Sequence, residues 1–256
     1  MHFEKFINLC ECTVKAKHFL YCNPLITHLV NLEEQKMAYF SDRVNAGRRL
    51  ASALADFAGK NAIVLAIPRG GVVVGYEISK ALNLPLDVII PHKIGAPDNP
   101  ELAIGAMTED GTVILDENLV AYVGVPKSYI KEESERQKRE IERRLKMYRQ
   151  SEPYPNLLGR DVIIVDDGIA TGSTMKAALA SVKNRGAKTV TVAVPVGPPS
   201  TIKELKRQAD RVIFLHTPEY FQAIGQFYRD FNQTTDEEVI QLLKKANKKT
   251  LRSRQG

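Results

Sequence analysis

Two adjacent carboxylates, Asp166 and Asp167, directly follow four apolar residues, Val162–Val165. A short apolar run is typical of a buried strand. Folding alone does not explain two like charges side by side, because their repulsion costs stability unless a cation or a hydroxyl-rich ligand arrives. The pair therefore indicates a binding site.

The loop after the acid pair, residues 168–174, reads Gly-Ile-Ala-Thr-Gly-Ser-Thr and leads into a helical pattern. Backbone N–H groups, hydroxyls and the dipole at the start of a helix together favour a phosphate. No lysine precedes Ser173 and the two glycines stand four apart, so the loop is neither a P-loop nor a dinucleotide-binding G-x-G-x-x-G. Such a loop suits a terminal phosphomonoester, and the carboxylates suit hydroxyls or Mg²⁺. Together they indicate a ribose 5-phosphate.

A second loop, Pro-Arg-Gly-Gly, follows the apolar run at residues 62–67. Gly70 and Gly71 let backbone N–H groups approach an anion closely, and Arg69 adds charge and directed donors. An ordinary turn between a strand and a helix is the alternative interpretation of this loop.

A third loop is expected at residues 91–101, which are rich in turn residues and long enough to move. Lys93 there is either a mobile cation or an exposed lysine without a role. His92 is more typical of a polar neighbour than of a catalyst.

These loops need a scaffold that brings strand ends together. Helical patterns separate five short apolar runs, which is typical of a doubly wound α/β domain with a parallel sheet. Ligands of such sheets bind beyond the carboxyl ends of the strands. The predicted strands are residues 62–67, 86–90, 162–165, 189–194 and 211–215.

The main domain is expected at residues 37–232. Its first helix is capped by Ser41 or Asp42 and stops at Gly59. Residues 233–256 are expected to form a C-terminal helix with a basic tail.

Two insertions interrupt the strand–helix alternation. Asp110-Gly111 predicts a hairpin turn between residues 101–107 and 112–116. Residues 128–150 predict a long charged helix that is mostly a solvated face.

Residues 1–36 show no clean period and are expected to be a loosely ordered extension. All three cysteines lie there, but Cys10, Cys12 and Cys22 match zinc spacing poorly. The segment also lacks the pattern of a signal peptide, and no apolar run of the chain approaches the roughly 18 residues of a membrane helix. These features predict a cytoplasmic protein without a membrane partner.

The basic charge is confined to the C-terminus. The chain carries a formal net charge of +6, and six basic residues with no acid follow Glu238, so the preceding residues are neutral on balance. A neutral body argues against a nucleic acid partner, and a solvated helix end is the simplest interpretation of the tail.

The stretch VIIVDDGIATGST, residues 162–174, resembles the motif that binds 5-phosphoribosyl 1-pyrophosphate (PRPP) in type I phosphoribosyltransferases. The resemblance spans roughly residues 38–232. The segments FSDRVNAGRRLA, IPRGGVVVGYEI, HKIGAPDNPELAIGA and FQAIGQFYRDF look like a widespread branch of that family whose acceptors are poorly assigned.

The resemblance implies a role for each loop. Asp166 and Asp167 would hold the ribose hydroxyls, directly or through Mg²⁺, and Lys93 would sit on a flexible loop that closes over pyrophosphate. A hood near residues 195–232 would select the acceptor base. The resemblance assigns PRPP binding to Asp166, Asp167, Gly168, Ile169, Ala170, Thr171, Gly172, Ser173 and Thr174, and pyrophosphate binding to Arg69, Gly70, Gly71 and Lys93.

The implied activity is transfer of phosphoribosyl from Mg·PRPP to a nitrogenous base or similar acceptor with release of pyrophosphate. Lys93, Arg69 and Asp167 would be its catalytic residues, and a homodimer is possible. A PRPP sensor without transfer activity and a PRPP hydrolase are the alternatives. The acceptor stays open: Ala170 stands where hypoxanthine-type members have an acid, and Glu101 is either an acid on the loop or a local partner.

Overall fold

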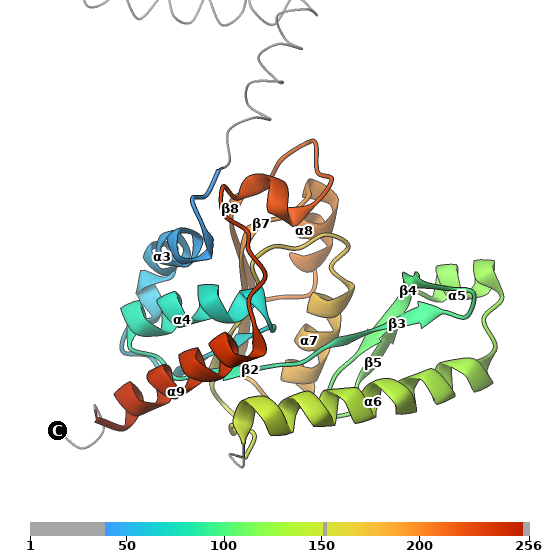
Figure 1. Ribbon diagram of the computed structural model, residues 1–256, viewed down its shortest axis with the longest axis horizontal. Coiled ribbons are helices and arrows are strands. Elements are labelled where there is room, and N and C mark those ends of the chain that lie inside the picture. Colours follow the sequence, from blue (N-terminus) through green and yellow to red (C-terminus); the bar gives the residue numbers. More distant parts are fainter. Residues whose placement is uncertain (1–38, 151–152, 253–256) are drawn as a thin grey trace, which may run out of the picture. The chain divides into compact units, whose positions relative to one another are not determined.

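The computed structural model describes residues 39–150 and 153–252 (Figure 1). The chain divides into two compact units, Met1–Tyr39 and Phe40–Gly256, and the second is described below. The expected N-terminal extension and its cysteines lie outside the described residues. The domain boundaries predicted from the sequence stay a prediction. None of the described helices is long and apolar enough to span a membrane.

A five-stranded parallel sheet forms the centre of the second unit, in the order β2-β1-β6-β7-β8 (Figure 1). All five predicted strands and the doubly wound α/β class are confirmed, with small shifts at the ends. The strands are β1 (Ala62–Ala66), β2 (Leu86–Val88), β6 (Asp161–Val165), β7 (Thr189–Val196) and β8 (Arg211–His216).

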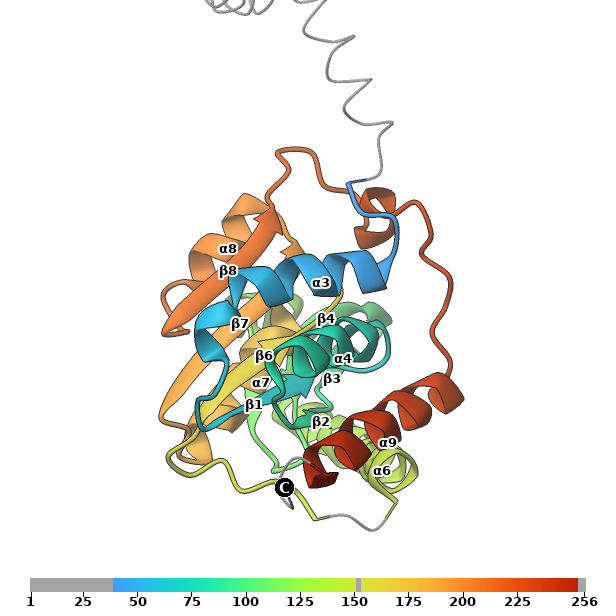
Figure 2. The ribbon, with the colours of Figure 1, turned by 90° about the vertical axis from the view of Figure 1, so that its left-hand side faces the viewer.

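Helices cover both faces of this sheet (Figure 2). Successive side chains of a strand point to opposite faces. Val64 and Ile163 therefore pack in one buried cluster with α3, α4 and α9, whereas Ile63 and Ile164 pack in another with α7 and α8. The helices are α3 (Arg43–Ala53), α4 (Gly70–Leu82), α7 (Ser173–Asn184), α8 (Pro199–Leu205) and α9 (Asp236–Arg252).

The first helix begins as its sequence predicts. Asp42 is the N-cap, and its Oδ1 accepts a hydrogen bond from the Asn45 N–H at 2.6 Å. The predicted stop at Gly59 was wrong, because α3 ends at Ala53 with Leu54 as its C-cap. A short 3-10 turn, η1 (Ala55–Phe57), follows, and Gly59 takes a positive φ of 75° after that turn. The Asp42 cap fixes the start of the helix, and with it the position from which the side chain of Arg43, the first helical residue, projects.

An arm, residues 92–149, extends from the sheet (Figure 1). It has a three-stranded antiparallel sheet in the order β3-β4-β5 and two helices. The hairpin turn predicted at Asp110-Gly111 is confirmed between β4 and β5, and so is the long charged helix, α6. The elements of the arm are β3 (His92–Ala96), β4 (Asn99–Met107), β5 (Val113–Leu115), α5 (Glu117–Val123) and α6 (Lys127–Arg149).

The prediction of a loop over residues 91–101 was wrong for all but a short turn, because β3 ends at Ala96 and β4 already begins at Asn99. His92–Ala96 pair with β4, with Lys93 opposite Ala106. The turn residues suggested a loop, but here they lie at an irregularity within paired strands, since the register shifts at Gly95. Gly95 has no side chain, so the backbone of Pro100 can approach closely; a Cβ on Gly95 would lie 2.5 Å from the Pro100 oxygen. The glycine thus accommodates a bulge within a strand.

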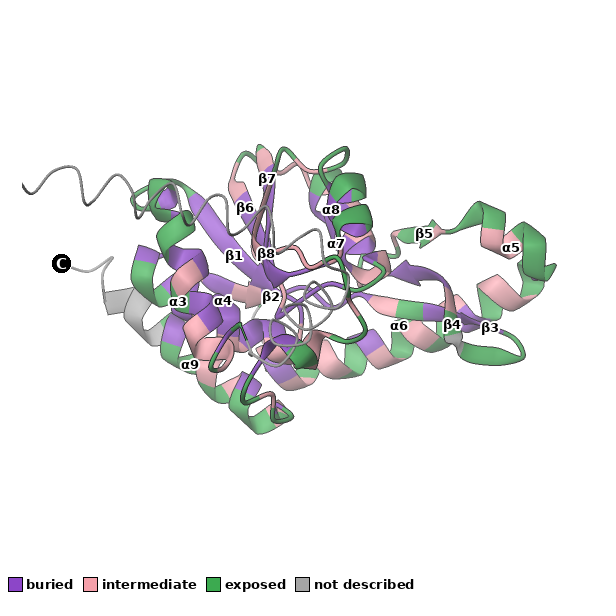
Figure 3. Cartoon of the chain, turned by 90° about the horizontal axis from the view of Figure 1, so that it is seen from above, coloured by how far each residue is buried: buried purple, intermediate pink, exposed green. Residues whose placement is uncertain are grey.

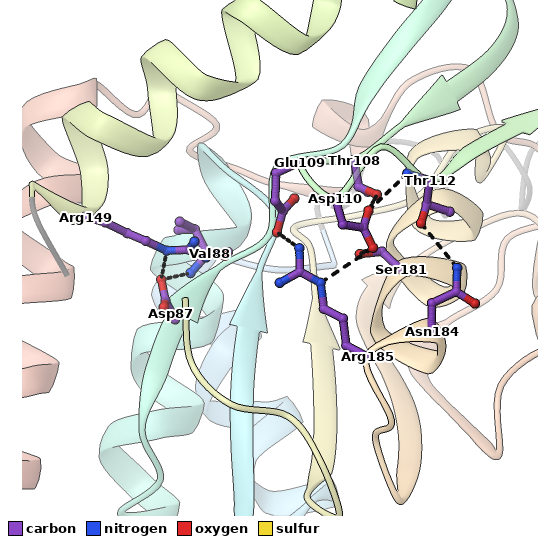
Figure 4. Close-up of polar contacts among 10 residues, drawn as sticks. All are labelled: Asp87, Val88, Thr108, Glu109, Asp110, Thr112, Arg149, Ser181, Asn184 and Arg185. Atoms are coloured by element: carbon purple, nitrogen blue, oxygen red, sulfur yellow. Dashed lines mark hydrogen bonds and ion pairs between the residues drawn. The ribbon is translucent and has the colours of Figure 1, made fainter. Parts of the chain in front are cut away.

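Polar contacts fix the base of the arm (Figure 4). The Ser181 hydroxyl of α7 donates to Asp110 Oδ2 at 2.9 Å, and Arg149 at the end of α6 donates to Asp87 Oδ1 of β2 at 2.9 Å. By contrast, α5 buries no residue, and Figure 3 shows it largely exposed. The arm is therefore anchored where it meets the central sheet and solvated at its far end.

Candidate functional site

Two of the expected loops touch each other at the carboxyl edge of the sheet. β1 and β6 are neighbours, with Ala66 opposite Val165, so the loops that follow them leave side by side. A Cβ on Gly70 would overlap Asp167 Oδ2, and a Cβ on Gly71 would lie 2.9 Å from the Asp166 Cα. Both glycines are therefore required because backbone packs directly against the acid pair. The peptide bond between Pro68 and Arg69 is cis.

The acid pair is shielded from solvent. Asp167 is only 9% exposed and Asp166 is half-buried. The Asp167 N–H donates to Asp166 Oδ1 at 2.8 Å. Burial, and then the neighbouring Asp167 charge, raise the pKa of Asp166 well above its usual value. A cation or hydroxyl donors would relieve this penalty, as the sequence indicated.

Arg43 is a site residue that the sequence reasoning missed. Its Nε donates to Asp167 Oδ2 at 2.7 Å, and each of the two side chains is 12% exposed. The only signal was a position directly after the N-cap, but two further arginines, Arg48 and Arg49, follow in the same helix. Nothing in their spacing distinguishes the arginine that turns toward the acid pair.

The loop after the acid pair opens onto the start of α7. Gly172 is the N-cap of this helix with φ 78°, and among the described residues no side chain caps the helix start. The first N–H groups of α7 are therefore not taken up by a cap, which suits an anion. The Thr171 and Ser173 hydroxyls lie 3.2 Å apart, and Thr201 steadies the loop by donating to the Ala170 carbonyl at 2.7 Å.

Unlike the two glycines, which pack against the acid pair, Arg69 and Lys93 form no hydrogen bond or ion pair with it among the described residues. Arg69 is the N-cap of α4, and its Nη1 lies 4.0 Å from Asp236 Oδ1 of α9. Lys93 is exposed on β3 and, within the described part of the chain, forms no hydrogen bond or ion pair with the acid pair or with Arg69. The structure thus brings Gly70, Gly71 and residues 166–174 together, but not Lys93. The Glu101 side chain lies outside the described part.

Two side chains of the segment predicted to be the hood contact the chain at the acid pair. A Cβ on Gly168 would lie 2.5 Å from Ile224 Cγ2, and the Tyr228 hydroxyl donates to the Asp167 carbonyl at 2.6 Å. Phe227 and Tyr228 are buried in a cluster with Phe40. These two aromatic residues therefore belong to the core, while Tyr220 is 54% exposed.

Comparisons with known proteins agree with this geometry. Residues 41–232 match the family described as Phosphoribosyl transferase domain. A Mycobacterium tuberculosis protein named "Putative phosphoribosyl transferase" is 43% identical over 212 residues in both strain CDC 1551 and strain H37Rv, covering 83% of this chain and 48% of the relative. The chain thus spans about half the length of these curated relatives.

A solved structure is similar as well. The crystal structure of TT1426 from Thermus thermophilus has 43% sequence identity and a TM-score of 0.69, covering 80% of this chain and 97% of the other. The family match includes α3 with Arg43, the Arg-Gly-Gly loop, the acid pair and the segment above it. The chain therefore belongs to the type I phosphoribosyltransferase family.

Proposed function

We propose that this protein transfers phosphoribosyl from Mg·PRPP to a nitrogenous acceptor and releases pyrophosphate. The observation that carries the proposal is the contact of Gly70 and Gly71 with the acid pair, beside the uncapped start of α7. One ligand that bears a diol between two phosphate groups fits these three adjacent parts. PRPP has this chemistry.

Each part takes one group of PRPP. Residues 170–174 hold the 5-phosphate with the first N–H groups of α7 and the loop hydroxyls. Asp166 and Asp167 accept hydrogen bonds from the ribose hydroxyls, which relieves the repulsion between the two carboxylates. Arg69 and the N–H groups of the Gly pair, Gly70 and Gly71, bind the pyrophosphate.

Magnesium fits the site as an ion shared with the substrate. Among the described residues there is no group of three or more His, Cys, Asp or Glu side chains that could hold a metal. Proteins commonly bind Mg²⁺ through one or two carboxylates together with substrate phosphates. Here Asp166 and Asp167 would hold the ion indirectly, through the ribose hydroxyls of the substrate that brings it. When bound, Mg²⁺ would supply positive charge at the pyrophosphate oxygens.

The reaction breaks the bond between C1 of the ribose and the pyrophosphate oxygen, and forms a bond from C1 to the acceptor nitrogen. Where that nitrogen carries a proton, the proton leaves to solvent. The bonding electrons leave with pyrophosphate, so negative charge grows there. Arg69 and the backbone N–H groups stabilise that charge. Lys93 would contribute to this stabilisation if the arm moved toward the site. The segment over Gly168 helps to exclude water, which would otherwise hydrolyse PRPP.

A PRPP-binding protein without an acceptor is the second candidate. Ile224 lies against Gly168, and Phe227 and Tyr228 are packed into the core, so these side chains do not line an open acceptor pocket. Binding of PRPP followed by signalling or hydrolysis needs no such pocket.

Pyrophosphate release distinguishes the candidates. The protein is incubated with Mg²⁺ and PRPP, alone and with purines, pyrimidines or small amines. Release that requires one acceptor supports transfer, release without an acceptor supports hydrolysis, and PRPP binding without release supports a sensor. Absence of PRPP binding by calorimetry contradicts all three. A cytoplasmic location and a homodimer are further proposals, which fractionation and sedimentation would test.

A further inference from the structure

Three contacts hold Arg43 at the acid pair. Its Nε donates to Asp167 Oδ2 at 2.7 Å, its Nη1 donates to the Asn232 carbonyl at 2.7 Å, and its guanidinium carbon lies 3.8 Å from the centre of the Phe231 ring. The side chain is only 12% exposed. A guanidinium fixed on an oxygen, a carbonyl and an aromatic face has little freedom to leave.

Arg43 occupies the side of Asp167 that faces the Gly pair. A Cβ on Gly70 would overlap Asp167 Oδ2 and lie 2.6 Å from Arg43 Nε, so the oxygen, the guanidinium and the glycine are packed together. The main-chain carbonyl of Asp167 is also taken, since it accepts from Tyr228. A divalent cation at this carboxylate would have to displace the arginine or lie close to a buried positive charge.

We propose that Arg43 is a positioning residue that keeps a bare divalent cation off Asp167 and reserves the acid pair for ribose hydroxyls. Mg²⁺ then enters only with the pyrophosphate-bearing substrate. The statement about the substrate rests on the proposed function, whereas the exclusion of a cation from the empty site does not. The physical reason is the number of available ligands. Arg43 neutralises Asp167, and the one carboxylate that remains, Asp166, provides too few ligands to bind a free ion without substrate phosphates.

The test is a titration of the substrate-free protein with Mn²⁺, with free Mn²⁺ measured by electron paramagnetic resonance. Arg43→Gln removes the charge, and Arg43→Met also keeps a stem that packs on Phe231. Arg48→Gln is the matched control, since it breaks another arginine–carboxylate pair of α3, with Glu77 at 3.1 Å. Melting curves verify that each variant folds.

Wild type and Arg48→Gln should show only weak background binding. Arg43→Gln and Arg43→Met should each gain one Mn²⁺ site at least tenfold tighter than that background, and adding Asp167→Asn should abolish it. Either a stoichiometric Mn²⁺ site in wild type that Asp167→Asn removes, or a folded Arg43 variant without the gain, would overturn the proposal. If both Arg43 variants unfold, a stoichiometric Mn²⁺ site on Asp167 of the wild type would still refute the proposal.

A parallel titration with PRPP keeps the two proposals apart. If Mn²⁺ behaves as expected but wild type does not bind PRPP, the proposed function fails and the role of Arg43 in excluding cations stands. If PRPP binds wild type but the substrate-free protein already holds Mn²⁺ on Asp167, only the role of Arg43 fails. With PRPP present, wild type should bind one Mn²⁺ that it does not bind alone.

Discussion

Gly70→Ala is the sharpest perturbation of the contact between the two loops. Alanine ordinarily stabilises a helix relative to glycine, by up to about 1 kcal/mol, and Gly70 is the first residue of α4. A general helix argument therefore predicts a more stable protein. The structure predicts the opposite, because the added Cβ would overlap Asp167 Oδ2 and approach Arg43 Nε to 2.6 Å.

The expected magnitude follows from what must move. Inserting a methyl group into a packed site costs about 1–3 kcal/mol, and separating a buried ion pair costs about 3–5 kcal/mol if nothing replaces the contact. Arg43 and Asp167 can shift in part, so we expect a net loss of about 2 kcal/mol in the free energy of unfolding after the helix gain is subtracted. For a domain of this size that corresponds to a Tm lower by about 4–8 °C.

The assay is thermal melting together with PRPP calorimetry. Gly197→Ala is the control, because its Cβ would meet no atom closer than 3.4 Å and should change neither quantity. Gly70→Ala should lower Tm and weaken PRPP binding at least tenfold, since Asp167 is displaced. An unchanged Tm together with unchanged PRPP binding would refute the packing of the Gly pair on the acid pair.

Three further changes test the site and its surroundings. Asp166→Asn should weaken PRPP binding by about 10–100-fold, the value of a hydrogen bond to a charged group, and calorimetry showing no change would exclude Asp166 from the site. Tyr228→Phe removes the donor to the Asp167 carbonyl and should cost about 1–3 kcal/mol in denaturant unfolding; an equal stability would mean that water replaces the hydroxyl. Burial raises the pKa of Glu109 above its ordinary value of 4.5. The folded state therefore binds the proton of Glu109 more tightly than the unfolded state does. As a result, the free energy of unfolding falls as pH rises from 4.5 through the raised pKa. Glu109→Gln should remove that fall in urea melts at a series of pH values, and a fall that persists would assign it to another group.

Sequence patterns predicted the parts whose signals are local. A buried parallel strand appears as a continuous apolar run, so β1 and β6 were found, and the carboxyl-edge rule then brought the acid pair near the Gly pair. The cap was narrowed to Ser41 or Asp42 because capping depends on one side chain and the N–H three residues later, and the structure selects Asp42. These features require no knowledge of distant partners.

Features that depend on a distant partner were missed. Lys93 lies in a strand because β4 pairs with it, and the neighbouring glycine and prolines suggested a loop. Arg43 meets Asp167 across 124 residues of sequence, and no pattern in α3 separates it from Arg48. The acid pair in the sequence indicates that a positive charge lies nearby, but only the fold shows that Arg43 provides it.

The strand pairing of Lys93 changes how the arm must act. The sequence suggested a free loop that closes over pyrophosphate, but Lys93 is paired with β4 and the base of the arm is fixed to the core by Asp110 and Arg149 (Figure 4). Any movement of Lys93 toward a ligand therefore involves the paired strands β3 and β4 and not a free loop. Arg69 lies outside the arm, directly before Gly70, so it depends on no movement of β3 and β4, although its guanidinium lies 4.0 Å from Asp236. Pyrophosphate charge would thus be met first by Arg69 and the backbone, and by Lys93 only in a second, slower step.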